Sequence, residues 1–597
     1  MTPPNKKSAV IARMFPFLSW FSGYQGADVK ADFTAGLTVA VVLIPQSMAY
    51  ALLAGLPPVY GLYAAAVTPI IAALWGSLRQ LATGPIAIMS LLVLTTLSPL
   101  AEPGSEQFIR LAFLLSFMVG VIYLIIGLFR MGVIMSFISH SAVKGFTSAA
   151  ALIIISTQLP HLLGVRIERT EYMFHKLLNI VMALPQTHWP TLVVGMVAMG
   201  IIFGLKKWRA TFPGALVALL TVTLAVVIFK LHTKGIAIIG QSPSGLPGFE
   251  MPPFQFDTMS RLVGPAVVLA LVSFAETYSV GKSISAETKQ KLDVDQEFVG
   301  QGMANLVGSF FQCYPVSGSF SRTAISFATG ARTGISSAVT SLSVVVALLF
   351  LTPYLTYIPK AALAAMVISA VLMLFHPREV FRLWKMNRDD GIVAVTVFVL
   401  SLLAKPDEAL LLGVLMSLMF FLWKTMHPRI VRISKVPELG VFLNADLTNA
   451  PSCPQILQLR SDNAIYFANA EYTIEHILKR FNAQQTPVKY LLLDLQSMAF
   501  IDITGVEELR VLKEEVEARG AELAMMEIRG PVKEVLGSSG FIEEMHPRYL
   551  LKKRGDAYSV LFGEIDHDYC RDTCPYALFH ECRTVKTCPP NQTKCVP

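Results

Sequence analysis

Charged side chains are scarce in this chain. Only 15% of its 597 residues are Asp, Glu, Lys or Arg, against roughly a quarter in soluble domains. Apolar residues make up 53%, which excludes a disordered chain and a collagen. Cysteine is also rare, with seven residues in all, so the chain is not a small domain built on disulfides. Together these shortages make an ordinary soluble enzyme a poor interpretation.

Features that enzymes and nucleic-acid-binding proteins need are missing as well. The formal net charge is +8, but no basic stripe is interleaved with aromatic residues, so no nucleic-acid partner is expected. The stretch Gly281-Lys282-Ser283 ends like a Walker A loop, yet that loop needs Gly at position 276, where Glu276 stands. No nucleophile with a neighbouring base emerges either. We therefore expect neither ATP-driven transport nor an enzyme.

Long apolar runs are what the chain has in abundance. Residues 111–129, 333–355 and 391–404 approach or exceed the ~20 residues that a helix needs to cross a bilayer. The pattern predicts an all-α polytopic membrane domain at 33–426, preceded by a cytoplasmic segment at 1–32. About 14 helical segments are expected, two of them short: 33–52, 59–77, 84–99, 109–128, 131–157, 190–205, 213–229, 262–281, 296–312, 319–329, 333–353, 358–375, 390–404 and 408–425.

The loop charges predict how these segments are oriented. Lys and Arg collect in alternate loops, which places those loops and both ends of the chain in the cytoplasm. The opposite side receives a loop with two Glu residues and a Pro-rich stretch at 240–253. One outside segment, 165–176, carries three basic residues and fits this topology less well.

Two segments are unusually short and are interrupted by Gly or Pro. One is Thr83–Ser90 and the other is Tyr314–Arg322. They are the third segments of a first and a second set of seven, and short broken segments at matching positions are a pointer to a transporter's binding site. An odd number of segments per half makes the halves inverted. We therefore expect two short helices that begin near mid-membrane with their N-termini facing.

Facing helix N-termini predict an anion site. They bring together unpaired N–H groups and two positive dipole ends. Ser319, Ser321 and Thr323 can add hydroxyl donors, and Arg322 adds a full positive charge. A charge near the bilayer centre costs at least ~2.5–3.5 kcal/mol, so a functional role is the default hypothesis. The alternative is that Arg322 reaches the membrane surface or pairs with a structural carboxylate.

Polar residues in two other segments could complete this site. Glu276 lies deep in an apolar helix, where it could be the counter-charge of Arg322 or carry a proton. The alternative is a helix-end Glu already at the cytoplasmic water. Gln46 and Tyr50 are one turn apart and face the same side of the first segment, where they suit an oxyanion or its water shell. Hydrogen bonding between helices is the alternative for this pair.

Several long motifs resemble one known family. They are 45–51 (Pro-Gln-Ser-Met-Ala-Tyr-Ala), 55–63 (Gly-Leu-Pro-Pro-Val-Tyr-Gly-Leu-Tyr), the Gly84-Pro85 pair, the Ser273–Lys282 helix with its Glu, the Asn305–Ser309 stretch, and Ser317–Thr323. These motifs and their order resemble the SulP family of sulfate permeases and anion exchangers. The resemblance covers about 30 to 560, nearly the whole chain.

The resemblance implies a seven-plus-seven inverted repeat with core and gate subdomains, an elevator-like movement of the core, and a homodimer. It places the anion between the third and tenth helices. The residues it would place at the anion are Gln46, Tyr50, Ile86, Ala87, Phe320, Ser321 and Arg322, with Glu276 beside them. Position 46 can be acidic in this family. Because this chain has Gln46, Glu276 is the better candidate for a proton-carrying residue.

A mixed, charged region at 436–565 predicts a small cytoplasmic α/β domain. Strand-like stretches at 440–444, 464–467 and 489–494 alternate with helical ones near 471–484, 504–518 and 530–538. This region resembles the STAS domain that the family usually carries. In related anti-sigma-factor antagonists a phosphorylated Ser stands where this chain has Ile503, so regulation by that route is not expected. Thr504, beside it, is expected to be a helix N-cap. For the domain we expect a part in dimerisation, trafficking or regulation.

The last segment, 566–597, is a cysteine-rich tail that the resemblance does not cover. It contains Cys570, Cys574, Cys582, Cys588 and Cys595, with His567 and His580 nearby. In a reducing cytoplasm such a cluster binds metal more often than it forms disulfides. The first four cysteines are candidate ligands for zinc or an iron–sulfur centre, although no C-x2-C pair is present. Redox-sensitive thiols and the absence of a specific role remain alternatives.

The function predicted from these observations is secondary anion transport across a bacterial inner membrane, with sulfate and H⁺ as the expected substrate and coupling ion. The argument for an anion is physical, and the argument for sulfate rests on the resemblance. Sodium-coupled bicarbonate uptake, chloride/bicarbonate exchange and C4-dicarboxylate transport are alternatives. A membrane sensor or scaffold that acts through the STAS domain and the tail is an alternative of another class. No cofactor is expected to be required for transport.

Overall fold

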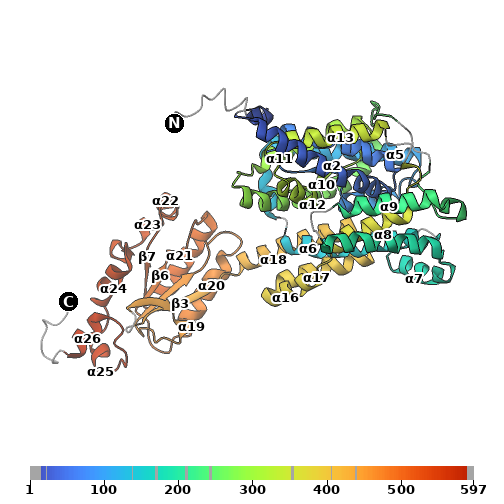
Figure 1. The fold of residues 1–597 in the computed structure, drawn as a ribbon. Coiled ribbons are helices and arrows are strands. Elements are labelled where there is room, and N and C mark those ends of the chain that lie inside the picture. Colours follow the sequence, from blue (N-terminus) through green and yellow to red (C-terminus); the bar gives the residue numbers. More distant parts are fainter. Residues whose placement is uncertain are drawn as a thin grey trace. The chain divides into compact units, whose positions relative to one another are not determined.

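The computed structural model describes residues 15–587, apart from 22, 138, 168–172, 209–212, 241–244, 351–354, 405 and 437–439. The chain forms two compact units that divide within helix α18, between Leu418 and Met419. Figure 1 shows a helical unit, coloured from blue to yellow, and a mixed α/β unit in orange and red. Each unit is described by itself.

Every predicted membrane segment has a helix in the first unit. The first set is α2 (Gly26–Leu53), α3 (Pro58–Trp75), α4 (Ala87–Leu97), α5 (Glu106–Leu128), α6 (His140–Leu163), α8 (Trp189–Trp208) and α9 (Gly214–Ile228). The second set is α10 (Phe256–Thr288), α11 (Val294–Phe310), α12 (Phe320–Ala328), α13 (Ile335–Phe350), α15 (Lys360–Val371), α17 (Arg388–Leu403) and α18 (Pro406–Met426). Among the described residues, eight helices are long and apolar enough to cross a membrane.

Three of the differences from the prediction concern α6, α7 and α16. Helix α6 begins at His140 because 132–137 forms a separate 3-10 turn, although both lie in one apolar run. Helices α7 (Met173–Ala183) and α16 (Pro377–Met386) were not predicted. Both are too short to span a bilayer. Helix α16 is strongly amphipathic, and Arg and Lys alternate with apolar residues along its sequence. The apolar runs therefore predicted the spanning helices and missed the amphipathic ones.

The helices of this unit pack in two groups. In one group α5 and α3 pack against α11, while α13 packs against α2 and α3. In the other, α6 packs against α15 and α17, and α8 packs against α9 and α15. Helices α2, α10, α12 and α13 lie together in Figure 1, and α6, α8 and α17 lie together below them. Both short helices, α4 and α12, contact α2 and α10 in the first group.

Glycine allows a close contact between helices α5 and α11 of the first group. A Cβ added to Gly120 on α5 would lie 2.5 Å from the backbone N of Leu306 on α11. A Cβ on Gly302 of α11 would lie 3.0 Å from the backbone N of Leu124 on α5. Such reciprocal small residues let two backbones approach, which is how membrane helices gain packing energy without a hydrophobic driving force.

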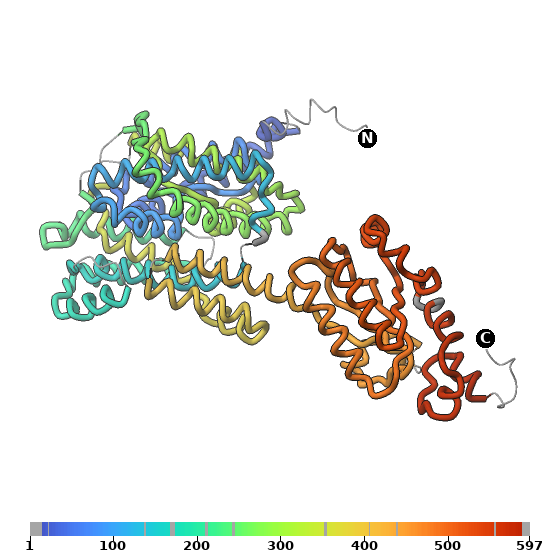
Figure 2. Tube along the Cα trace, turned by 180° about the vertical axis from the view of Figure 1, so that it is seen from behind, coloured from blue at the N-terminus to red at the C-terminus, as the bar shows by residue number. Residues whose placement is uncertain are grey.

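The second unit, whose Cα trace Figure 2 shows from behind in orange and red, is built on a six-stranded sheet. Its strands are β3 (Ile430–Val436), β4 (Val441–Asn444), β5 (Ile456–Ser461), β6 (Tyr490–Asp494), β7 (Glu522–Met526) and β8 (Leu550–Leu551), in the order β4-β3-β5-β6-β7-β8. Strand β3 pairs antiparallel with both neighbours, and β5 to β8 are parallel. The helices are α19 (Ala445–Thr448), α20 (Ala470–Asn482), α21 (Ile503–Glu517), α22 (Gly530–Ser538), α23 (Phe541–Glu544), α24 (Arg554–Phe562), α25 (His567–Asp572) and α26 (His580–Thr587).

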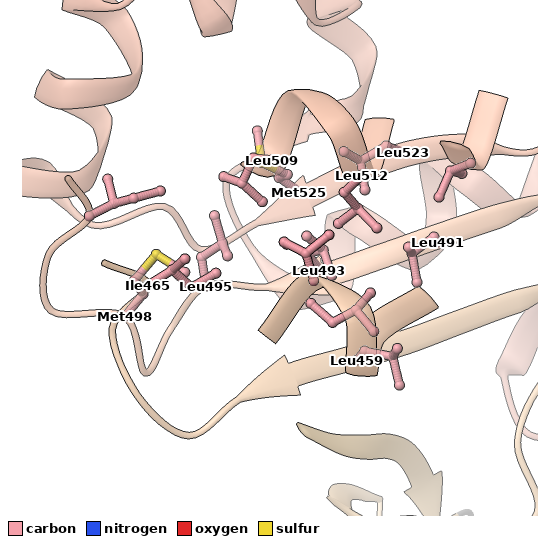
Figure 3. Close-up of a cluster of buried hydrophobic side chains, with 14 of the residues drawn as sticks. Leu459, Ile465, Leu491, Leu493, Leu495, Met498, Leu509, Leu512, Leu523 and Met525 are labelled. Atoms are coloured by element: carbon pink, nitrogen blue, oxygen red, sulfur yellow. The ribbon is translucent and has the colours of Figure 1, made fainter. Parts of the chain in front are cut away.

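Alternate residues of the central strands fill two apolar layers. Leu491 and Leu493 of β6 point into a layer with α20, α21 and α22, part of which Figure 3 shows. Tyr490 and Leu492 point into the other layer, with α24, α25 and α26. Because side chains alternate along a strand, one β-strand serves both layers.

The Tyr490 hydroxyl also donates a 2.7 Å hydrogen bond to Glu564, which lowers the pKa of that carboxyl.

The start of α21 corrects one prediction. Asp502, not Thr504, is the N-cap, and its side chain accepts a 2.8 Å hydrogen bond from the backbone N of Gly505. Thr504 lies inside the first turn. Asp caps helices at least as well as Thr, and here it stands two residues earlier. Ile503 is exposed.

Gly120→Ala is expected to destabilise the helical unit. The new methyl group would meet the α11 backbone, which cannot rotate away, and overpacking of this kind costs about 1–3 kcal/mol. Gly200→Ala is the matched control, because a Cβ at Gly200 on α8 meets nothing within 4 Å. Thermal unfolding of the purified protein in detergent measures both. Equal melting temperatures for the two variants would contradict the close packing of α5 on α11.

Candidate anion site

Two short strands position the beginnings of α4 and α12. Strand β1 (Thr83–Gly84) pairs antiparallel with β2 (Ser317–Gly318), so that Thr83 lies opposite Gly318 and Gly84 opposite Ser317. The backbone N of Ser319 donates to the carbonyl of Ala82 at 2.9 Å. The Thr323 hydroxyl accepts a 2.9 Å hydrogen bond from the backbone N of Ala82. Each strand runs directly into its helix, and this pairing brings the two helix N-termini to one place.

Neither of these helices is capped by its own N-cap side chain. Ile86 is the N-cap of α4 and Ser319 is the N-cap of α12, and neither side chain accepts a hydrogen bond from a backbone N–H of its first turn. The first backbone N–H groups of a helix have no partner within the helix. They carry the positive end of the helix dipole, so two uncapped N-termini at one point attract negative charge. The prediction of facing short helices agrees with this arrangement.

Arg322, in the first turn of α12, is the largest side chain that is almost fully buried, with 1% of its surface exposed. Its Nη1 donates to the carbonyl of Pro85 at 2.8 Å. Its Nε and Nη2 are buried and have no hydrogen-bond partner. Gly84 leaves room for the guanidinium, because a Cβ there would lie 3.3 Å from Nη2. The side chain therefore keeps N–H donors for something other than the described protein groups.

The structure gathers the polar residues that the sequence singled out in other helices. Arg322 lies within electrostatic range of Tyr50 on α2 and Glu276 on α10. Among the described residues, Oε2 of Glu276 and Oε1 of Gln46 are buried without a hydrogen-bond partner. Arg322, Tyr50 and Glu276 thus come from three helices to one place near the beginning of α12, and Gln46 lies one turn before Tyr50 on α2.

The remaining predicted residues belong to the first turns themselves. Ile86 and Ala87 are buried at the start of α4. Ser321 is half-buried, with its Oγ 3.4 Å from Oγ of Ser319. Phe320 opens α12 and is 58% exposed, so its backbone rather than its ring belongs to the buried centre.

Sequence reasoning missed two residues that support this centre. The Thr277 hydroxyl accepts a 3.1 Å hydrogen bond from the backbone N of Gly318 and lies 2.8 Å from Oγ of Ser317. Tyr314 is fully buried, and its hydroxyl lies 3.3 Å from Oγ of Ser90 on α4. The available signals were positional: Thr277 follows Glu276, and Tyr314 opens the second broken segment.

Two side chains of helix α11 form hydrogen bonds with Thr83 of β1 and with Val316, the residue before β2. The Asn305 side chain accepts from the backbone N of Val316 at 2.9 Å and donates to the carbonyl of Val316 at 3.1 Å. Gln301, one turn earlier, donates to Oγ1 of Thr83 at 2.8 Å. Because both side chains are buried, these hydrogen bonds are strong constraints on the backbone that carries the two helix starts.

The predicted metal ligands lie in the soluble unit. Cys570 and Cys582 are buried and Cys574 is half-buried, while Cys588 lies outside the described residues. In the described part of the chain no group of three His, Cys, Asp or Glu side chains is arranged to hold one metal ion.

A helical unit with two broken helices, followed by an α/β unit, is a fold shared with solved structures of other membrane proteins. The structure matches that of SLC26A9 with a TM-score of 0.85 at 22% identity, covering 94% of this chain and 95% of the other. It matches the transmembrane domain of the cyanobacterial bicarbonate transporter BicA with a TM-score of 0.57 at 22% identity, covering 66% and 98%. At these identities the likeness concerns the fold alone.

The chain belongs to the sulfate permease family. The family profile of that description matches residues 29–397, and a STAS domain profile matches residues 448–553. Sulfate transporter 4.1, chloroplastic, of Arabidopsis thaliana is 34% identical over 580 residues, which are 94% of this chain and 84% of that protein. A probable sulfate transporter of Mycobacterium tuberculosis is 32% identical over 531 residues, covering 89% and 95%. These relatives are transporters and not enzymes.

Thr277→Val is expected to loosen the start of α12. Valine keeps the shape of threonine but leaves the buried N–H of Gly318 without its acceptor, which costs about 1–3 kcal/mol. Thr277→Ser keeps the hydroxyl and is the matched control. The melting temperature of the purified protein should fall for Thr277→Val and stay closer to wild type for Thr277→Ser. A larger loss in the serine variant would mean that the methyl group, and not the hydrogen bond, matters.

Proposed function

We propose that this chain is a secondary active transporter that carries sulfate together with protons. The observation that supports an anion most directly is the convergence of two uncapped helix N-termini on the buried Arg322. An oxyanion placed there would accept hydrogen bonds from both first turns and from the unpaired Nε and Nη2 of Arg322. Ser321, Gln46 and Tyr50 would border the same anion.

The unpaired donors of Arg322 favour the binding of a ligand at this site. A buried polar atom without a partner costs about 1–3 kcal/mol, and more when the group is charged. The guanidinium has two such atoms at one place, beside helix ends that are themselves short of acceptors. A tetrahedral oxyanion offers several hydrogen-bond acceptors together with a negative charge, whereas a water molecule is neutral. Sulfate is the oxyanion that the names of the relatives in Arabidopsis and Mycobacterium carry.

Glu276 is the residue that we propose to couple transport to protons. Its Oε2 is buried and unpartnered, and the carboxylate lies within electrostatic range of Arg322. An arriving anion would weaken the hold of Arg322 on this carboxylate, and proton uptake would then remove a negative charge from the site. Gln46 cannot carry a proton in this way because an amide does not titrate between pH 5 and 8.

The transport movement that we propose is of the elevator type. Helices α4 and α12 belong to the group that includes α2 and α10, which would form the moving core, while the group around α6, α15 and α17 would form the gate. We further propose a homodimer in a bacterial inner membrane with both termini in the cytoplasm. The STAS domain would serve dimerisation, trafficking or regulation. Transport itself would need no cofactor.

Arg322→Gln should weaken anion binding strongly. Losing a hydrogen bond to a charged group costs about 1.5–3 kcal/mol, which corresponds to about 10- to 160-fold in affinity. Equilibrium binding of radiolabelled sulfate to the purified protein measures this. Arg261→Gln is the matched control, since Arg261 is an exposed arginine paired only with Asp257 of its own helix among the described residues. Unchanged sulfate affinity in Arg322→Gln would reject the proposed site.

Glu276→Gln should abolish the acceleration of sulfate uptake by a proton gradient. Proteoliposomes with the wild-type protein should take up sulfate faster under an inward proton gradient, and the variant should respond to the gradient at most weakly. Glu287→Gln, an exposed substitution on the same helix, is the control for effects of the amide itself. Gradient-driven uptake that persists in Glu276→Gln would keep the substrate and remove Glu276 from coupling.

The same assay decides between substrates. An absence of sulfate uptake under any gradient would reject sulfate, and uptake of bicarbonate with sodium, of chloride or of succinate would then identify the transported anion. Binding of sulfate without uptake of any anion would point to a sensor that acts through the STAS domain and the tail.

A further inference from the structure

A cavity lies where the segment before the first membrane helix meets the ends of two other helices. Its volume is about 210 Å³, far more than the ~10–15 Å³ that one water molecule needs. One wall is the 3-10 helix η1 (Pro16–Phe21). The other walls are the end of α3 with residues 76–79 after it, and residues 290–291, which follow α10. All of these elements belong to the helical unit.

The ends of three helices place this cavity at the boundary between lipid and water. Helices α2, α3 and α10 are each long and apolar enough to cross a membrane. Helix α2 begins at Gly26, shortly after η1, and α3 returns the chain to the same side, where it ends at Trp75. Helix α10 ends at Thr288, beside the same cavity. The cavity therefore lies at the level of the lipid headgroups, on the side where the loop charges predict the cytoplasm.

Two basic residues line the cavity, and both are exposed. They are Arg79 and Lys291, and among the described residues neither side chain has a hydrogen-bond or ion-pair partner. The carboxylate of Glu297 lies behind the wall but is 2% exposed and already paired. Its Oε2 accepts hydrogen bonds from the backbone N and the hydroxyl of Ser77 and from the backbone N of Leu78. Two free cations at a membrane surface favour a ligand with a phosphate group.

The segment that forms the first wall adds an apolar surface beside these cations. Trp20 is buried, and it packs so closely before α13 that a Cβ added to Gly334 would overlap its ring. Phe15, Leu18 and Phe21, in and beside η1, are exposed. Aromatic side chains of this kind gather at membrane interfaces. A fixed apolar segment next to a basic cavity suits a ligand with a phosphate at one end and hydrocarbon at the other.

We propose that this cavity binds the phosphate headgroup of an anionic phospholipid. Arg79 and Lys291 contact the phosphate, and the acyl chains lie along the exposed apolar side chains of the η1 segment. Those side chains are the reason to expect a lipid and not free phosphate. The site is separate from the one at Arg322 and does not depend on which anion is transported. A bound lipid links η1 to α3 and to the chain after α10.

The test measures binding of fluorescently labelled phosphatidylglycerol to the full-length protein purified in detergent. Phosphatidylcholine with the same acyl chains is the neutral comparison. Each basic residue near an anionic lipid contributes about fivefold in affinity, so the double variant Arg79→Gln/Lys291→Gln should bind phosphatidylglycerol roughly 25-fold more weakly and phosphatidylcholine as before. The matched control is Lys206→Gln/Lys207→Gln, which removes two exposed lysines at the end of α8 and should bind both lipids like the wild type. Size-exclusion elution shows whether each variant is folded.

Three results would overturn the proposal. One is wild-type protein that binds phosphatidylglycerol no more tightly than phosphatidylcholine, which decides the question without any variant. Another is that the two double variants bind phosphatidylglycerol alike, which would indicate diffuse surface charge and no particular site. The third is displacement of the lipid by inorganic phosphate at concentrations near the dissociation constant of the lipid, which would make the cavity a site for free phosphate.

Discussion

Two helices that begin inside the membrane unit without a capping side chain are the constraint on which the rest of that unit depends. Backbone groups at membrane depth must find partners, because the bilayer has no water to offer. The pairing of β1 with β2 satisfies part of this demand, and Asn305 and Gln301 on α11 hold the strands in place. Thr277 and Thr323 do the same from α10 and α12. Among the described residues, Nε and Nη2 of Arg322 remain buried without a hydrogen-bond partner beside these helix starts.

The spare donors of Arg322 give polar residues from helices far apart in sequence a reason to lie near it. Tyr50 and Glu276 would each be costly in an apolar helix, but both lie within electrostatic range of this guanidinium. The close glycine contacts between α5 and α11 serve the same arrangement indirectly, since α11 carries the two amide side chains that fix the strands.

Much of this could be predicted from the sequence, for specific reasons. Long apolar runs identified the spanning helices, and the interruptions at Gly84-Pro85 and Tyr314-Pro315 identified the two broken ones, because Gly and Pro have strong local effects on the backbone. The amphipathic α7 and α16 were missed, because a search for membrane spans uses the mean hydropathy of a segment and ignores whether the apolar residues lie on one side of a helix. Tyr314 and Thr277 were missed because their roles depend on which segments the fold brings together, and Asp502 was overlooked as a cap because Thr504 stood beside the expected phosphorylation position.

The neutral amide at position 46 has an electrical consequence. With Glu276 protonated, the proposed loaded site would combine one positive guanidinium with a divalent anion and so carry one net negative charge. The empty site, with Glu276 ionised, would be neutral. Moving the loaded core across a membrane with a negative interior would therefore work against the potential by about 2.3 kcal/mol for each 100 mV. A protonated acidic residue at position 46 would leave that charge unchanged, but once ionised it would give the empty site one negative charge, and this charge would move back as the empty core returns. With Gln46 the empty core would return neutral, so each proposed transport cycle would move one net negative charge across the membrane.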